Sequence, residues 1–130
     1  IELKKVEKIR KVILCSGKIY FDLLEAREKR KIDDIVFYRI EQLYPFPAKS
    51  LVKELKPYAK NAKFYWCQEE PKNMGAWFSV RDYIQWTLDN IKANNKQVTY
   101  IGRSPDASPA TGYAKWHNSQ QKEIIEKVFE

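Results

Sequence analysis

Two adjacent carboxylates, Glu69 and Glu70, are the first residues whose types and spacing could do chemistry, because paired acids can exchange protons or bind a metal ion. However, neighbouring side chains on an extended chain point in opposite directions. No histidine or second acid pair lies nearby in the sequence. Trp66 and Trp77 flank the polar residues 68–73, and aromatic residues often anchor protein interfaces. We therefore expect this segment to contact a partner rather than to catalyse.

Three further features could hold an anion or move a proton, and each also has a structural interpretation. Ser16-Gly17-Lys18 joins an apolar run to a helical pattern, where backbone amides could hold an anion, but it lacks a complete phosphate-binding glycine motif. Arg27 and Arg30 share a helix face and could clamp a phosphate, or they form a solvated helix end. The single histidine, His117, has no serine or cysteine arranged beside it and is typical of a core or rim residue.

Cys15 and Cys67 are the only cysteines, and each ends an apolar run. They form no C-x-x-C pair and have no second cluster of metal ligands. This pattern favours buried, unreactive thiols in a reducing compartment. A nucleophilic role would require a helix N-terminus or a base nearby, and Cys15 is close to a predicted helix start.

The bulk properties indicate one globular domain. The chain has 130 residues, 44% of them hydrophobic, which is enough for a core. No apolar run is long enough to span a membrane, and no signal peptide opens the sequence. A net charge of +7 suits an anionic ligand or an acidic partner, whereas no nucleic-acid-binding motif is present. Because the sequence starts at Ile1 rather than Met, we interpret it as part of a longer polypeptide.

Strands and helices are predicted to alternate along the chain. Short apolar runs predict strands at residues 11–15, 35–40, 62–67 and 97–101. Helical spacing follows each run and is strongest over residues 77–91. Ser16 is expected to cap the first helix and Pro47 to lie in the first turn of the second. This order implies an α/β domain at residues 10–130 whose mainly parallel sheet has helices on both faces, preceded by a linker or edge segment at residues 1–9. The polar turns then gather at the carboxyl ends of the strands.

Several longer segments identify a family when they are taken together. They are LCSGKIY at 14–20, RIEQLYPFP at 39–47, WCQEEPKNMGAW at 66–77, YIGR at 100–103, and SPATGY at 108–113 with Lys115 and His117. In this order they closely resemble the C-terminal domain of thiamine-diphosphate-dependent 2-oxoglutarate dehydrogenases. Met74 stands where many members carry Gln, which is a conservative departure.

The resemblance implies a transketolase C-terminal-like fold: a three-layer α/β/α domain with a mostly parallel sheet and one antiparallel strand. It implies a parent enzyme of the tricarboxylic acid cycle that decarboxylates 2-oxoglutarate and passes the succinyl group to lipoyl-lysine of dihydrolipoyl succinyltransferase. Thiamine diphosphate and magnesium would lie between the two preceding domains of a homodimer, and this domain alone would bind neither and be inactive. No nucleic-acid or membrane partner is implied. The location would be the cytoplasm of a bacterium or the mitochondrial matrix of a eukaryote.

The resemblance implies two kinds of site residues: residues that contact other domains or the second subunit, and residues that bind a regulatory anion. No catalytic, cofactor-binding or metal-binding residue is expected. Contacts with other domains or the second subunit are expected at Gln68, Glu69, Glu70, Lys72, Asn73, Trp77, Ser108, Thr111 and His117. Some members of the family bind acetyl-CoA as a regulator, and such an anionic ligand would find Arg27, Arg30 and Gln42. The alternative is a free-standing α/β module that binds a nucleotide or CoA.

Overall fold

The computed structural model describes residues 2–103 and 114–130, and for residues 114–117 it describes the backbone only. Four strands form one sheet in the order β2-β1-β3-β4. They are β1 (Lys11–Cys15), β2 (Ile35–Arg39), β3 (Lys63–Pro71) and β4 (Val98–Arg103). All three strand pairings are parallel, as expected when a helix returns the chain to the same end of the sheet after each strand. The expected antiparallel strand is not found among the described residues.

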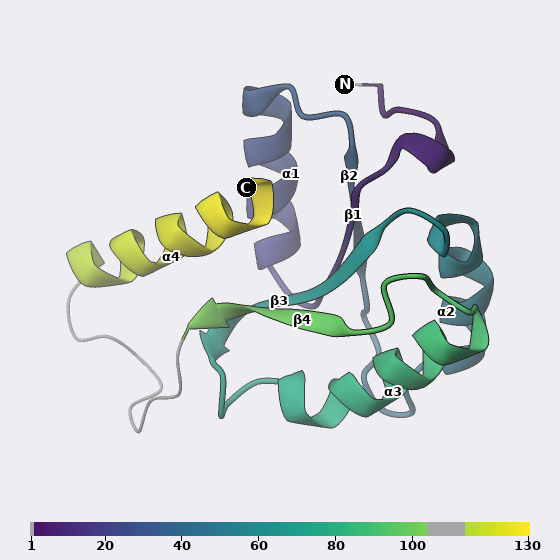
Figure 1. The fold of residues 1–130 in the computed structure, drawn as a ribbon. Coiled ribbons are helices and arrows are strands. Elements are labelled where there is room, and N and C mark those ends of the chain that lie inside the picture. Colours follow the sequence, from purple (N-terminus) through teal and green to yellow (C-terminus); the bar gives the residue numbers. More distant parts are fainter. Residues whose placement is uncertain (1, 104–113) are drawn as a thin grey trace.

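Four helices cover the two faces of the sheet (Figure 1). Helices α1 (Ile19–Arg30) and α4 (Ala114–Phe129) lie on one face. Helices α2 (Ala48–Leu55) and α3 (Trp77–Asn90) lie on the other. The domain therefore has the three α/β/α layers that were expected. No helix in the described part of the chain is long and apolar enough to cross a membrane.

The central strand β1 explains why the sheet is buried on both faces. Its side chains alternate, so that Val12 and Leu14 enter the core under α2 and α3, whereas Ile13 and Cys15 enter the core under α1 and α4. All four side chains are fully buried. A strand buried on both faces requires the uninterrupted apolar run seen in the sequence.

Several boundaries differ from the sequence-based expectations; Pro47, for example, lies at the N-cap of α2 rather than in its first turn. Ser16 does not cap α1, because the helix begins at Ile19 and no side-chain hydrogen bond caps its N-terminus. Strand β3 extends through Pro71, although a loop was expected from Gln68 onward. The extension is stabilised by β4, which pairs with β3 as far as Pro71, with a shift of register after Cys67. Four of the residues expected to form a polar loop, Gln68 to Pro71, are therefore placed by strand geometry.

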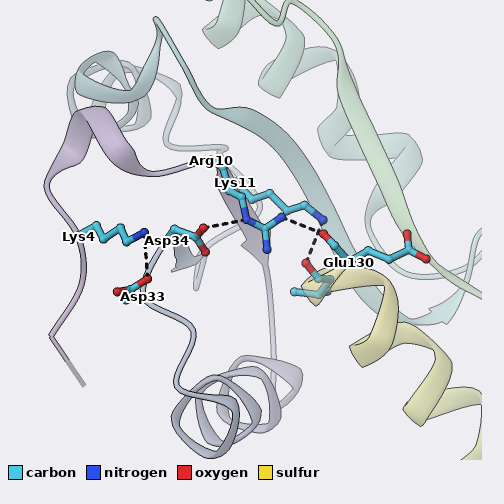
Figure 2. A network of polar contacts seen from close by, with 7 residues as sticks. Lys4, Arg10, Lys11, Asp33, Asp34 and Glu130 are labelled. Carbon is cyan, nitrogen blue, oxygen red and sulfur yellow. Dashed lines mark hydrogen bonds and ion pairs between the residues drawn. The ribbon is translucent and has the colours of Figure 1, made fainter.

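At the amino ends of the strands, here called the amino edge of the sheet, residues at the start of β1 contact the end of α4 (Figure 2). The Arg10 guanidinium bonds the carboxylate of Asp34 at 3.0 Å and the backbone oxygen of Glu130 at 2.8 Å. Residues 2–9 contain no strand; they include a short 3-10 helix at Val6–Lys8. Lys4 of this segment lies 3.7 Å from Asp33, near the amino end of β2. Its assignment as a linker or edge segment stays a prediction.

Candidate functional site at the carboxyl edge of the sheet

A crevice opens where the carboxyl ends of β1 and β3 lie side by side. The chain leaves β1 toward one side of the sheet and leaves β3 toward the other, which is the topological arrangement that creates binding crevices in open α/β sheets. The cavity there measures about 670 Å³. Its lining combines backbone turns, aromatic rings and carboxylates: Ser16, Gly17, Leu43, Tyr44, Trp66, Gln68, Glu69, Glu70, Gly75, Ala76, Ser79 and Tyr83.

The amide of Gln68 organises one wall of this crevice. The side chain is only 3% exposed. Its Oε1 accepts hydrogen bonds from the indole Nε1 of Trp66 at 2.9 Å and from the backbone N–H of Trp77 at 3.1 Å. Its Nε2 donates to the backbone oxygens of Pro71 at 3.0 Å and Met74 at 2.9 Å. One side chain thus holds the end of β3, the following turn and the start of α3, so it positions the turn and is not available to a partner.

Gly75 completes the turn that Gln68 holds. Its φ of +65° lies in the left-handed region that favours glycine. A Cβ at this position would lie 3.0 Å from Oε2 of Glu70 and 3.2 Å from the side-chain amide of Gln68. The turn therefore requires glycine for both its backbone conformation and its packing.

The two adjacent carboxylates point to different faces of the sheet, as the extended backbone predicted. Glu69 accepts a 2.6 Å bond from Nζ of Lys18 and a 3.0 Å bond from Nε2 of Gln121, so it connects β3 to α1 and α4. The hydrogen bond to Glu69 raises the pKa of Lys18. Glu70 is exposed on the face of α3, and its carboxylate forms no ion pair with any described residue. Because the carboxylates do not converge, they do not form an acid–base pair.

The remaining predicted contact residues differ widely in accessibility. Trp77 is buried beside Tyr100, with ring centroids 5.4 Å apart. The ammonium of Lys72 lies 5.4 Å from the centre of the same tyrosine ring. Burial raises the pKa of Tyr100 to about 12, and its hydroxyl donates to the backbone oxygen of Arg103 at 2.7 Å. Asn73 is exposed.

Three predicted contact residues fall where the structure gives little or no description. Ser108 and Thr111 lie outside the described residues. His117 belongs to helix α4, and its side chain is outside the described part. Their expected role in domain contact therefore stays a prediction.

No group of three or more His, Cys, Asp or Glu side chains in the described residues is arranged to hold a metal ion. Cys15 and Cys67 pair across adjacent strands, and both are buried thiols, as expected. Burial raises the pKa of Cys15 to about 12 and also raises the pKa of Cys67. Neither thiol is suited to act as a nucleophile.

The two arginines of the predicted anion site are engaged within the domain. Arg27 donates from Nη1 to the backbone oxygen of Ile35 at 3.0 Å, and its guanidinium covers the ring of Phe37. Arg30 bonds the carboxylate of Glu126 at 2.6 Å and connects α1 to α4. These contacts give both side chains a structural role in packing the helices on the sheet.

Gln42 lies beyond the carboxyl end of β2, whereas Arg27 contacts the amino end of that strand. The residue that Arg27 bonds is the first of β2 and lies at the amino edge of the sheet. The amide of Gln42 is exposed and donates to the backbone oxygen of Tyr44 at 3.3 Å. The structure therefore does not bring the three residues into one site.

Sequence reasoning missed a group of exposed aromatic side chains beside the crevice. Tyr44 is 91% exposed, Tyr83 is 49% exposed and Trp86 is 47% exposed. The sequence did contain a signal for this exposed group, because Tyr83 and Trp86 lie off the apolar stripe that predicted α3. Large aromatic residues on the outer face of an amphipathic helix are typical of a contact surface.

Comparison with known proteins gives a consistent picture. Residues 2–129 match the family described as 2-oxoglutarate dehydrogenase C-terminal. The 2-oxoglutarate dehydrogenase E1 components of Brucella anthropi and Brucella ovis are 53% identical over 129 residues, which cover 99% of this chain and 13% of theirs. Among solved structures, a split-gene transketolase, described as an inactive beta4 tetramer, is similar with a TM-score of 0.56 and 12% identity over 95% of this chain and 38% of that one. At this identity the likeness shows the fold alone.

Proposed function

We propose that this chain, which belongs to the 2-oxoglutarate dehydrogenase C-terminal family, acts as a structural and contact domain within a complete E1 component. The complete enzyme would decarboxylate 2-oxoglutarate and transfer the succinyl group to lipoyl-lysine of dihydrolipoyl succinyltransferase. The single observation that carries the proposal is the 53% identity to E1 components over 99% of the chain. The chain spans 13% of the length of these relatives, so most of the machinery for the reaction would lie in other parts of the polypeptide.

Thiamine diphosphate supplies the carbanion-stabilising chemistry of such a reaction when it is bound. The chain spans only 13% of its E1 relatives, which leaves the rest of the polypeptide to hold the thiamine diphosphate and its magnesium ion. We therefore assign thiamine diphosphate and magnesium to the preceding domains of a homodimer. The relatives named above are bacterial, and on that basis we assign the enzyme to the cytoplasm.

The carboxyl edge of the sheet is the part of this domain that we assign to contact with the other domains. Glu70 and Asn73 are exposed there, on a turn whose conformation is fixed by Gln68 and Gly75. A turn held in this way presents its outward side chains at a lower entropic cost, because its backbone is already ordered before contact. Gln68 and Trp77 support this role from beneath the surface.

The contacts of Arg30 and Gln42 bear on the hypothesis that this domain binds acetyl-CoA. An anionic ligand such as acetyl-CoA would have to compete with Glu126 for Arg30, without help from Gln42. Calorimetry of acetyl-CoA with the wild-type chain and the Arg27→Ala/Arg30→Ala variant tests it. Equal heats from the two proteins would refute the site. The free-standing binding module is not favoured, because the relatives named above are E1 components.

The proposal is tested by comparing the full-length protein encoded by the gene with the 130-residue chain. We expect the full-length protein to release CO₂ from 2-oxoglutarate when thiamine diphosphate and Mg²⁺ are supplied, and the 130-residue chain to release none. Turnover by the isolated chain would contradict the assignment of the chemistry to other domains. A full-length protein that is folded but inactive on 2-oxoglutarate would contradict the assignment of the reaction.

A further inference from the structure

The aromatic surface, defined by Tyr44, Phe46, Tyr83 and Trp86, is a candidate docking site. The rings of Phe46 and Tyr83 are stacked, with centroids 5.2 Å apart and planes 12° from parallel, so the loop after β2 is fixed against α3. Beside the stack, Tyr83 and Trp86 line a groove of about 430 Å³. Fixed aromatic rings with large exposed faces provide apolar area for a partner at little cost in conformational entropy.

This surface continues into the crevice at the carboxyl edge. Tyr44 and Tyr83 line the crevice, and Tyr83 also lines the groove. Glu70 also lines the crevice, and its carboxylate is not neutralised by any cation in the described residues. The combined surface therefore offers aromatic faces and one negative charge that no described cation neutralises. Its chemical complement is an apolar segment that carries a Lys or Arg side chain, since cations bind favourably to both carboxylates and aromatic faces.

We propose that the aromatic surface is covered by the preceding part of the E1 polypeptide, which inserts a basic side chain opposite Glu70. This inference rests on the proposed function. The family is a C-terminal one and the chain spans 13% of its relatives, so the polypeptide available to cover the surface precedes this domain. Residues 2–9 reach the sheet at its amino edge, where Asn61 bonds the backbone oxygen of Glu7. Tyr44 and Tyr83 line the crevice at the opposite end of the strands, so the covering segment belongs to a more distant part of the polypeptide.

Hydroxyl-radical footprinting of the full-length protein tests whether the surface is covered. The rate of oxidation is measured for each side chain in the native protein and in the urea-unfolded protein. If the surface is a buried interface core, Tyr44 and Trp86 should be oxidised about tenfold more slowly in the native state. Phe21 is a matched control, because it is 55% exposed on α1 in the opposite layer and should be protected much less. Equal protection of Phe21, Tyr44 and Trp86 would overturn the inference.

Site-specific cross-linking identifies the covering segment. With p-benzoyl-L-phenylalanine in place of Tyr44, we expect cross-links in the full-length protein to Lys- or Arg-containing peptides from the region before this domain. Cross-links confined to the same domain of a second copy, or to the succinyltransferase, would overturn the inference. A Glu70→Lys variant should lower the cross-linking yield by about tenfold if Glu70 pairs with a partner cation. An unchanged yield would remove Glu70 from the contact and refute the inserted basic side chain.

Two variants separate this inference from the proposed function. Trp86→Glu should weaken association of the domain with the rest of the protein, seen as faster proteolytic release of the 130-residue segment from the full-length chain. Phe21→Glu should leave the release rate unchanged, and equal release of both variants would count against the aromatic surface. If the wild-type protein decarboxylates 2-oxoglutarate but Tyr44 remains reactive, the docking inference fails alone. If the wild-type protein is inactive on 2-oxoglutarate, the proposed function fails whatever the footprint.

Discussion

Lys11 donates a hydrogen bond from Nζ to the backbone oxygen of Val128 at 3.1 Å, across 117 positions of sequence. The donor lies at the start of the central strand β1, and the acceptor lies in the last turn of α4. A cation at the C-terminus of a helix interacts favourably with its unpaired carbonyl groups. Together with the bond from Arg10 to Glu130, this contact fixes the final helix on the sheet.

Replacing Lys11 with Met should loosen α4. Met fills a similar apolar volume but leaves the oxygen of Val128 without its donor, which should lower the free energy of unfolding by about 1 kcal/mol. Amide hydrogen exchange should accelerate most at Ile124 and Val128, which pack α4 on the sheet. An exchange profile identical to wild type would show that the bond does not hold the helix.

The same residue should give the stability a distinct dependence on pH. Burial lowers the pKa of Lys11 below its ordinary 10.5, so the folded state loses this proton at a lower pH than the unfolded state does. Between the lowered pKa and 10.5 the unfolded state binds more protons, and the contribution of Lys11 to stability therefore rises with pH. The free energies of unfolding of wild type and Lys11→Met, measured with urea, should differ increasingly as pH approaches 10.5. If the two free energies of unfolding changed in parallel with pH over this range, the lowered pKa of Lys11 would be contradicted.

Gln68→Ala should be among the most damaging single changes in the domain. It removes the acceptor of the Trp66 indole N–H and of the Trp77 backbone N–H, and the donor to the Met74 backbone oxygen, in a buried site. We expect the free energy of unfolding to fall by about 3 kcal/mol, measured by urea denaturation. Gln42→Ala is the matched control, because the Gln42 amide is exposed and makes one backbone contact, and it should cost less than about 0.5 kcal/mol. Equal losses for the two variants would rule out the organising role of Gln68.

Two glycines with positive φ should respond differently to alanine. Both Gly17 and Gly75 would incur the backbone cost of the left-handed region, about 1 kcal/mol. A Cβ at Gly17 meets nothing within 4 Å, whereas a Cβ at Gly75 meets Glu70 and Gln68. Gly75→Ala should therefore destabilise the domain more than Gly17→Ala in thermal or urea unfolding. The reverse order would contradict the packing described for the turn.

The two cysteines should be unreactive in the folded domain. Burial excludes reagents and keeps the Cys15 thiol protonated, with its pKa raised to about 12. At pH 8, a thiol-specific chromogenic reagent should label neither Cys15 nor Cys67 until urea unfolds the chain. Rapid labelling of one thiol under native conditions would show that this part of the sheet opens locally.

The sequence by itself determined the order of the elements, their apolar faces and the family. These features follow from local patterns: a short continuous apolar run such as that of residues 11–15 is typical of a strand buried on both faces, and the spacing from Trp77 to Ile91 repeats with the helix period. The position of polar turns at the strand ends also follows from this order.

Only the tertiary structure decided which polar residues are buried and which are exposed. Gln68 and Glu70 are both polar and close in sequence, but the β3–β4 pairing and the start of α3 surround Gln68 and leave Glu70 outside. Likewise, Arg27 and Gln42 were placed together from sequence, whereas β2 separates them to opposite edges of the sheet. The physical reason is that burial and hydrogen-bond partners come from strands and helices distant in sequence, and local spacing does not specify them.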